Sequence, residues 1–221
     1  MLIPEYRQEV LEKAQQMVID GLAYGAGGNI SAQDPETELI AITPSAIEYA
    51  RMSAEDIVII DAHGKVIEGK WKPTSETPMH TIFYRERQDV LAVVHTHAPY
   101  ASVFAIIDEP IPMVVTEAAL CVGGPVQVAP YTRPGTDDLA RVVLDTMGDG
   151  VSVLLGQHGM ITVGHNLGEA YAATIATEVS ARLTIFARAM GATPLALDLD
   201  EVAELRELYL KHYHPSAPDE A

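Results

Sequence analysis

Two histidines one residue apart, His95 and His97, follow the apolar run at 90–94. A short apolar run rich in valine predicts a buried strand. Side chains at positions i and i+2 of a strand project from the same side of it. The two imidazoles would therefore lie side by side at a strand end, which is half of a metal site. A catalytic metal there would need a third ligand and an acid or base from elsewhere in the chain.

The third ligand candidate is His158, which lies in a turn between Gly156 and Gly159. This turn directly follows a second apolar run, 151–155, and its glycines allow close approach of the backbone. Three neutral imidazoles that leave one coordination position open are typical of a catalytic metal site, commonly one for zinc. On spacing alone, the alternative that these histidines are only polar strand ends stays open.

Glu76 is the candidate general acid or base. It ends a loop that begins at Pro73, just before a helix predicted to start near Thr77 and Pro78, where proline suits the first turn. Acidic residues are also favoured at a helix start by the helix dipole, so capping is the alternative role. His80 could share a helix face with Glu76. Inside an amphipathic helix we expect it to be half-buried and not part of a second metal pair.

Three short segments supply uncharged hydrogen-bond donors: Gly28-Asn29, Ser45-Ala46 and Thr74-Ser75. Their backbone N–H groups, hydroxyls and amide could hold a phosphate without lysine or arginine. Each is also common in ordinary turns, and residues 27–31 have the turn-forming composition of a loop.

Composition restricts the partners. The net charge of −17 argues against sequence-independent binding to nucleic acid or to anionic membranes, but not against a small anionic substrate. Cys121 is the single cysteine, so the chain forms no intramolecular disulfide, which fits a reducing compartment. No apolar run reaches transmembrane length, and the N-terminus lacks a signal pattern. We expect a cytoplasmic protein.

The predicted elements form one mixed α/β layered domain spanning residues 1–221, without a linker or an internal repeat. Apolar periodicity predicts helices near 5–22, 77 onward, 99–107, 136–147, 167–190 and 200–213, and strands near 38–42, 56–60, 65–67, 90–95, 112–115, 126–129, 151–155 and 160–163. The strands at 56–60 and 65–67 form a predicted hairpin, which indicates antiparallel pairing.

Five motifs occur together in a recognisable order: Gly28-Asn29-Ile30-Ser31, Thr43-Pro44-Ser45, Lys72-Pro73-Thr74-Ser75-Glu76, His95-Thr96-His97 and Gln157-His158-Gly159. Through them the chain resembles the class II sugar-phosphate aldolase and epimerase family over nearly its whole length. The resemblance implies a three-layer fold, with a central, mostly antiparallel sheet flanked by helices. It also implies zinc or another divalent metal, and a homotetramer with active sites at subunit interfaces.

The resemblance also assigns roles to individual residues. His95, His97 and His158 match the three metal ligands, and Glu76 matches a glutamate that is both a metal neighbour and the acid/base. Epimerases of the family carry an aspartate at the position of Glu76, so this residue favours the aldolase branch. The residues that match the phosphate-binding loops are Gly28, Asn29, Ser45, Thr74 and Ser75.

Three positions bear on the rest of the pocket. Ala46 stands where the family's aldolases have glycine, in a loop that contacts phosphate. Glu117 stands where those aldolases have a tyrosine that acts as an acid on the aldehyde side. It could also be a solvated or paired carboxylate just off the strand predicted at 112–115. Tyr213 resembles a tyrosine contributed by the neighbouring subunit. The predicted catalytic residues are therefore Glu76, Glu117 and Tyr213.

The resemblance predicts an aldolase that cleaves a ketose 1-phosphate of the L-fuculose 1-phosphate type. Its products would be dihydroxyacetone phosphate and an aldehyde, formed through an enediolate that zinc stabilises as a Lewis acid. The alternatives are a sugar-phosphate 4-epimerase, a dehydratase or a hydroxy-acid decarboxylase on the same metal site. A non-catalytic, adducin-like module is disfavoured, because a degenerate copy should lose ligands and this chain keeps all three histidines and Glu76.

Overall fold

A computed structural model describes residues 1–212. At its centre is an eight-stranded sheet of order β4-β3-β2-β1-β5-β8-β7-β6. Every neighbouring pair is antiparallel except β6 and β7, which are parallel. The strands are β1 (Asn29–Gln33), β2 (Ile40–Ile42), β3 (Val58–Ile60), β4 (Val66–Glu68), β5 (Ala92–Thr96), β6 (Val128–Ala129), β7 (Ser152–Leu155) and β8 (Gly159–Gly164).

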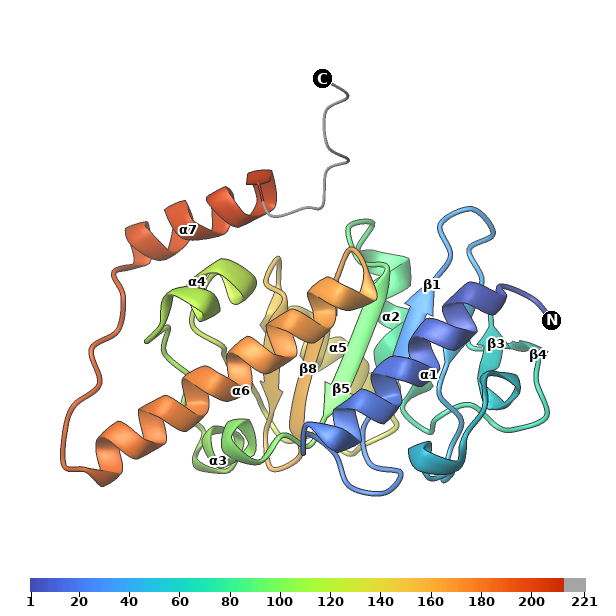
Figure 1. Cartoon of the computed structure of the whole chain (residues 1–221), viewed down its shortest axis with the longest axis horizontal. Coiled ribbons are helices and arrows are strands. Elements are labelled where there is room, and N and C mark those ends of the chain that lie inside the picture. Colours follow the sequence, from blue (N-terminus) through green and yellow to red (C-terminus); the bar gives the residue numbers. More distant parts are fainter. Residues whose placement is uncertain (213–221) are drawn as a thin grey trace.

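Helices cover both faces of this sheet, which confirms the predicted three-layer α/β fold (Figure 1). The helices are α1 (Pro4–Ile19), α2 (Thr77–Glu86), α3 (Pro99–Ile107), α4 (Thr116–Val122), α5 (Asp137–Met147), α6 (Leu167–Ala189) and α7 (Leu199–His212). One apolar core forms under α1, α3, α4 and α6, and a second forms under α2 and α5. Helix α7 packs outside, against α4. Within the described residues, no helix is long and apolar enough to cross a lipid bilayer.

Alternation along β5 decides which residues face α2. Ala92 and Val94 belong to the core under α1 and α6, whereas Val93 belongs to the core under α2 and α5. His95 follows Val93 at a spacing of two and therefore shares its face. In the neighbouring strand β1, Asn29 pairs with His95 and Ser31 pairs with Val93. This register places Asn29, Ser31 and His95 together on the α2 side of the sheet.

Several predicted elements are confirmed. The helix expected at 99–107 is α3, and the predicted hairpin is the antiparallel pair of β3 and β4. The helix expected to start near Thr77 is α2, which begins at that residue with proline in its first turn. The helix expected at 136–147 is α5, where Thr136 is the N-cap and its side chain accepts a hydrogen bond from Leu139 N–H.

The strand predicted at 112–115 is wrong. Only Ile111 makes an isolated bridge, to Val126, and the chain then enters α4 at Thr116. Pro110 and Pro112 flank that bridge and have no N–H group to donate to a ladder, so the pairing cannot extend.

The turn predicted at 27–31 is also wrong in part. Residues from Asn29 onward form β1, which lies between β2 and β5 within the sheet. Ile30 and Ala32 fill the core beneath α1, whereas Asn29 and Ser31 are buried as polar side chains on the opposite face. Turn-forming composition misled the prediction, because these polar side chains find hydrogen-bond partners inside the protein.

Candidate metal centre

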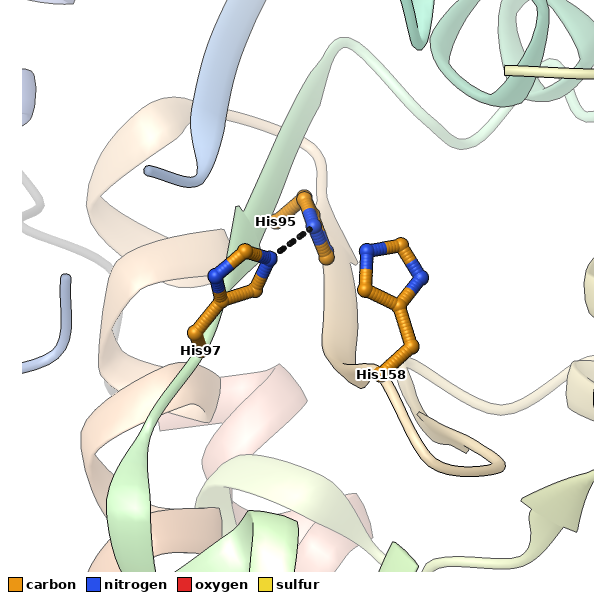
Figure 2. A group of neighbouring side chains, drawn as sticks. All are labelled: His95, His97 and His158. Carbon is orange, nitrogen blue, oxygen red and sulfur yellow. Dashed lines mark hydrogen bonds between the residues drawn. The ribbon is translucent and has the colours of Figure 1, made fainter. Parts of the chain in front are cut away.

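Antiparallel pairing of β5 with β8 brings the three histidines together. His95 is the second-last residue of β5, and His97 directly follows the end of that strand. His158 lies in the turn before β8, and its neighbour Gly159 lies so close to β5 that a Cβ atom there would collide with the Thr96 carbonyl oxygen. The three rings face one another, with centroids 4.8–5.2 Å apart (Figure 2).

The geometry of the imidazoles fits a divalent metal ion. One nitrogen from each ring lies within 4.8 Å of the others. The Nε2 atoms of His95 and His97 are 3.2 Å apart, and a tetrahedral ion bound at its usual distance needs nitrogens about 3.3 Å apart. Nδ1–H of His95 donates to the Met160 carbonyl at 2.9 Å, which leaves the Nε2 lone pair directed toward the other rings.

The protonation states of the rings also fit a metal. Burial, reinforced by His95, lowers the pKa of His97, with Glu76 opposing the shift. The same causes lower the pKa of His158 to about 4. Both rings are therefore neutral at neutral pH, the form that binds metals. Nδ1 of His158 is buried without a hydrogen-bond partner, as is Oε1 of Glu76.

Glu76 lies directly beside this cluster, at the N-cap position of α2. Its Oε2 atom is 3.1 Å from Nε2 of His95, and its Oε1 atom is 3.4 Å from Nε2 of His158. Asn29 Nδ2 donates a hydrogen bond of 2.8 Å to Oε2. Burial raises the pKa of Glu76, but the two histidines and the Asn29 hydrogen bond outweigh it and hold the pKa well below its usual range. The carboxylate is therefore ionised and can accept a proton.

A cavity of about 230 Å³ opens next to Glu76 and the histidines. Its lining includes every residue predicted to hold phosphate, which are Gly28, Asn29, Ser45, Ala46, Thr74 and Ser75. It also includes Pro134 and three residues of the metal centre, Glu76, His97 and His158. None of its lining residues, all within 1–212, is a lysine or an arginine. An anion in this cavity would therefore be held by backbone N–H groups, hydroxyls and the metal.

Backbone contacts hold the loops around the cavity in place. Ser45 N–H donates to the Lys72 carbonyl at 2.9 Å, and Thr74 N–H donates to the Thr43 carbonyl at 3.0 Å. Tyr49 donates its hydroxyl to the Gly28 carbonyl at 2.6 Å, which fixes the first loop from behind. These bonds join loops that are far apart in sequence into one wall.

Backbone conformation explains two of the loop residues. Gly28 has φ +69°, and a Cβ atom there would lie 2.6 Å from the His95 carbonyl oxygen, so only glycine fits. Ala46 has φ +61°, which is also left-handed. The loop therefore keeps the shape that glycine adopts readily, although alanine is strained there.

The structure brings the predicted metal, acid/base and phosphate residues to one place, but Glu117, a predicted catalytic residue, lies elsewhere. Glu117 is exposed in the first turn of α4, which packs against α6 and α7, and it does not line the cavity. Tyr213 lies outside the described residues. The functional roles of both remain predictions.

One residue near the site differs from its prediction. His80 is fully buried and not half-buried, and its Nε2 atom lies 2.5 Å from Oδ1 of Asn29. The sequence indicates that His80 lies near Glu76, because it follows Glu76 by four positions and residues at that spacing share a helix face. Pro134 was not predicted, because nothing in its local sequence marks it as part of the cavity.

Comparison with known proteins gives the same family as the motifs. The model of the class II aldolase and adducin N-terminal domain matches residues 8–185. The chain is 38% identical to 5-deoxy-D-ribulose 1-phosphate aldolase of Bacillus thuringiensis serovar kurstaki, covering 95% of this chain and 97% of that protein. It is 35% identical to 5-methylthioribulose-1-phosphate/5-deoxyribulose-1-phosphate aldolase of Rhodospirillum rubrum, covering 92% and 90%.

Solved structures agree with this result. The fold matches an L-fuculose 1-phosphate aldolase with a TM-score of 0.88 and 35% identity, covering 93% of this chain and 96% of that one. The match covers nearly the whole of both chains. The chain therefore belongs to the family of class II aldolase and adducin N-terminal domains.

Proposed function

We propose that this protein is a metal-dependent aldolase that cleaves a ketose 1-phosphate between C3 and C4. The products would be dihydroxyacetone phosphate and an aldehyde. One observation carries the proposal: the ionised Glu76 carboxylate lies 3.1 and 3.4 Å from two of three clustered imidazoles, at the edge of a cavity lined with uncharged donors. Relatives named for 5-deoxyribulose 1-phosphate support that compound as the first substrate to test, with L-fuculose 1-phosphate second.

The residues of this chain divide the work. The loops at Gly28, Ser45 and Thr74 would bind the phosphate through N–H and hydroxyl groups, which leaves the carbon chain directed toward the histidines. A divalent cation held by His95, His97 and His158, which we propose is zinc, supplies Lewis acidity that stabilises negative charge on the substrate.

Glu76 would move the proton at C3. In the condensation direction its ionised carboxylate removes a proton from C3 of dihydroxyacetone phosphate, and the aldehyde oxygen takes up a proton as the C3–C4 bond forms. In the cleavage direction the C4 hydroxyl gives up its proton as that bond breaks, and Glu76 delivers a proton to C3. Its position next to the cavity and to two of the imidazoles supports this role.

We further propose a cytoplasmic homotetramer of single-domain chains, with active sites at subunit interfaces. Exposed apolar side chains on α3 and α6, among them Ile106 and Phe186, are consistent with a surface that is covered by another copy. Glu117 does not line the cavity of its own chain. A catalytic role for Glu117 would therefore be exercised in the site of a neighbouring subunit. We propose the same for Tyr213, because it resembles a tyrosine that a neighbouring subunit contributes.

The experiment is a substrate panel with zinc-loaded protein. It contains 5-deoxy-D-ribulose 1-phosphate, L-fuculose 1-phosphate and, as a control without a 1-phosphate, L-ribulose 5-phosphate. Dihydroxyacetone phosphate is followed by coupled reduction with NADH, and the aldehyde is identified by mass spectrometry. We expect the two products in equal amounts from at least one ketose 1-phosphate. No dihydroxyacetone phosphate from either one would overturn the proposal, whereas a C4 epimer, a dehydrated ketone or carbon dioxide would identify the alternative reaction.

A further inference from the structure

A continuous chain of hydrogen bonds extends from the interior of the protein to Glu76. The hydroxyl of Tyr84 lies 2.6 Å from Oγ of Ser31, and the same Oγ lies 2.7 Å from Nδ1 of His80. Nε2 of His80 lies 2.5 Å from Oδ1 of Asn29, and Nδ2 of Asn29 lies 2.8 Å from Oε2 of Glu76. Ser31 and His80 are fully buried, so no solvent competes for these contacts.

Only one arrangement of protons satisfies every contact in this chain. Nδ2 of Asn29 donates to Oε2 of Glu76, so the amide presents its oxygen, Oδ1, to His80. Since Oδ1 only accepts, Nε2 of His80 must carry the proton. Burial, reinforced by His95 and opposed by Glu76, lowers the pKa of His80 to about 3, so the ring is neutral and Nδ1 has no proton. Nδ1 then accepts from Ser31, which in turn accepts from Tyr84.

This direction decides which oxygen of Glu76 is occupied. Oε2 accepts the Asn29 hydrogen bond, whereas Oε1 is buried without a hydrogen-bond partner and faces Nε2 of His158 at 3.4 Å. If the Asn29 amide turned over, its Oδ1 atom would face Oε2, and two acceptors would repel each other. The His80 N–H group prevents that rotation, because it binds Oδ1 from the other side.

We propose that His80 is a positioning residue for Glu76. As the Nε2–H tautomer it fixes the amide of Asn29, so that Glu76 is held by Oε2 and presents Oε1 as its reactive oxygen. This inference rests on the proposed acid/base role of Glu76. A purely structural role for His80, as a polar group that only needs partners in the core, is the alternative that an experiment must separate.

Two substitutions of similar size make that separation. In His80→Gln the amide nitrogen can reach the place of Nε2 and still donate to Asn29. In His80→Asn the shorter amide reaches only the place of Nδ1, next to Ser31, and leaves Oδ1 of Asn29 without its donor. We expect His80→Asn to lower kcat about 10–100-fold, the usual cost of losing such a supporting partner. The KM for the ketose phosphate should change little, and His80→Gln should keep most of the activity.

Ser31→Ala is the second variant, in case His80→Asn fails to fold. It removes the donor to Nδ1, which is one of the two contacts that favour the Nε2–H tautomer and hold the ring in place. We expect a lower kcat with a nearly unchanged KM. Its matched control is Ser152→Ala, because Ser152 is also a buried strand serine, bonded to Thr177 at 3.0 Å in the interior. The control should lower the melting temperature without lowering kcat.

A second readout does not depend on activity. In metal-free protein labelled with 15N-histidine, NMR should show His80 as the neutral Nε2–H tautomer near neutral pH, assigned by the signals missing in His80→Gln. The opposite tautomer, or equal losses of kcat in His80→Gln and His80→Asn with an active wild type, would overturn the inference. Failure of the proposed function is distinct from these results, since it would appear as a wild-type protein that forms no dihydroxyacetone phosphate.

Discussion

Glu76 and His95 meet where α2 approaches the sheet, with Oε2 of the carboxylate 3.1 Å from Nε2 of the imidazole. The cluster that can hold a metal consists of the three histidines, and Glu76 adjoins it. Under the proposed function the two residues have separable roles, His95 in holding the metal and Glu76 in moving a proton. Substitutions at the two positions should have different consequences.

Glu76→Gln should keep the metal and lose turnover. Glutamine has nearly the shape of glutamate and can still accept the Asn29 hydrogen bond, but it cannot take up a proton at neutral pH. We expect kcat to fall about 10²–10⁴-fold, the usual contribution of a general acid or base. Metal content by elemental analysis should stay at the wild-type ratio. A variant that loses metal as completely as His95→Ala would contradict the separate roles.

His95→Ala should lose both metal and activity, because it removes one of three ligands. In the wild type, zinc at about 100 times its dissociation constant should stabilise the fold by about 2.7 kcal/mol, which raises the melting temperature. The variant should show no such shift when zinc is added. His63→Ala is the control, since His63 is exposed near the tip of the β3–β4 hairpin. If His63→Ala abolished the shift as well, the assignment of the ligands would be wrong.

Ala46→Gly should stabilise the protein. Alanine with φ +61° costs about 1–2 kcal/mol relative to a right-handed conformation, whereas the greater freedom of glycine in the unfolded chain costs about 0.5–1 kcal/mol. The difference predicts a gain of up to about 1.5 kcal/mol in the free energy of unfolding, measured by urea denaturation.

Ala203→Gly is the matched control for this substitution, because Ala203 is exposed in the interior of α7, where glycine costs about 1 kcal/mol. Destabilisation by both substitutions would show that the loop at Ala46 is not strained.

Asp56→Asn should change how stability depends on pH. Hydrogen bonds from Trp71 and Ser53, together with Lys70, hold the pKa of Asp56 well below its usual range, against the opposing effect of burial. A lowered pKa in the folded state means that the carboxylate stabilises the fold above the unfolded pKa of about 3.9 and loses this effect as pH falls below it.

The free energies of unfolding of wild type and Asp56→Asn should therefore differ most near neutral pH and converge below about pH 4. The measurement is urea denaturation of both proteins across that pH range. A difference that stays constant with pH would contradict the linkage. The result also bears on the site, because the Trp71 contact anchors the segment that leads to Thr74 and Glu76.

The histidine cluster could be predicted from the sequence because its geometry follows from simple periodicity. Two residues separated by one position on a strand face the same side, so the spacing of His95 and His97 alone predicts that their side chains lie together. His158 is harder, because its approach to them depends on the pairing of β5 with β8. Its place in a turn after the apolar run 151–155 makes His158 a candidate ligand, and the family resemblance assigns it that role.

The surroundings of His80 could not be predicted in the same way. Its partners Asn29 and Ser31 come from β1, where this asparagine and serine, together with the preceding Gly27 and Gly28, are typical of a turn. A polar side chain on a central strand is stable only when a partner from another element completes its hydrogen bonds. That partner is set by packing between α2 and the sheet, which local sequence does not encode.

Pairing between β5 and β8 has a consequence for how such a protein can diversify. The histidine nitrogens that could hold a metal come from two segments joined by one antiparallel ladder, in which Thr96 pairs with Met160. Ala105 and Ala129 accept hydrogen bonds from Gln157 and Gly156 and so hold the turn that carries His158. Helix α4, which includes Glu117, makes neither of these contacts and can therefore gain or lose length without moving those nitrogens, provided that the ladder keeps its register. Substrate preference can thus evolve in one part of the chain while the metal chemistry is inherited unchanged in another.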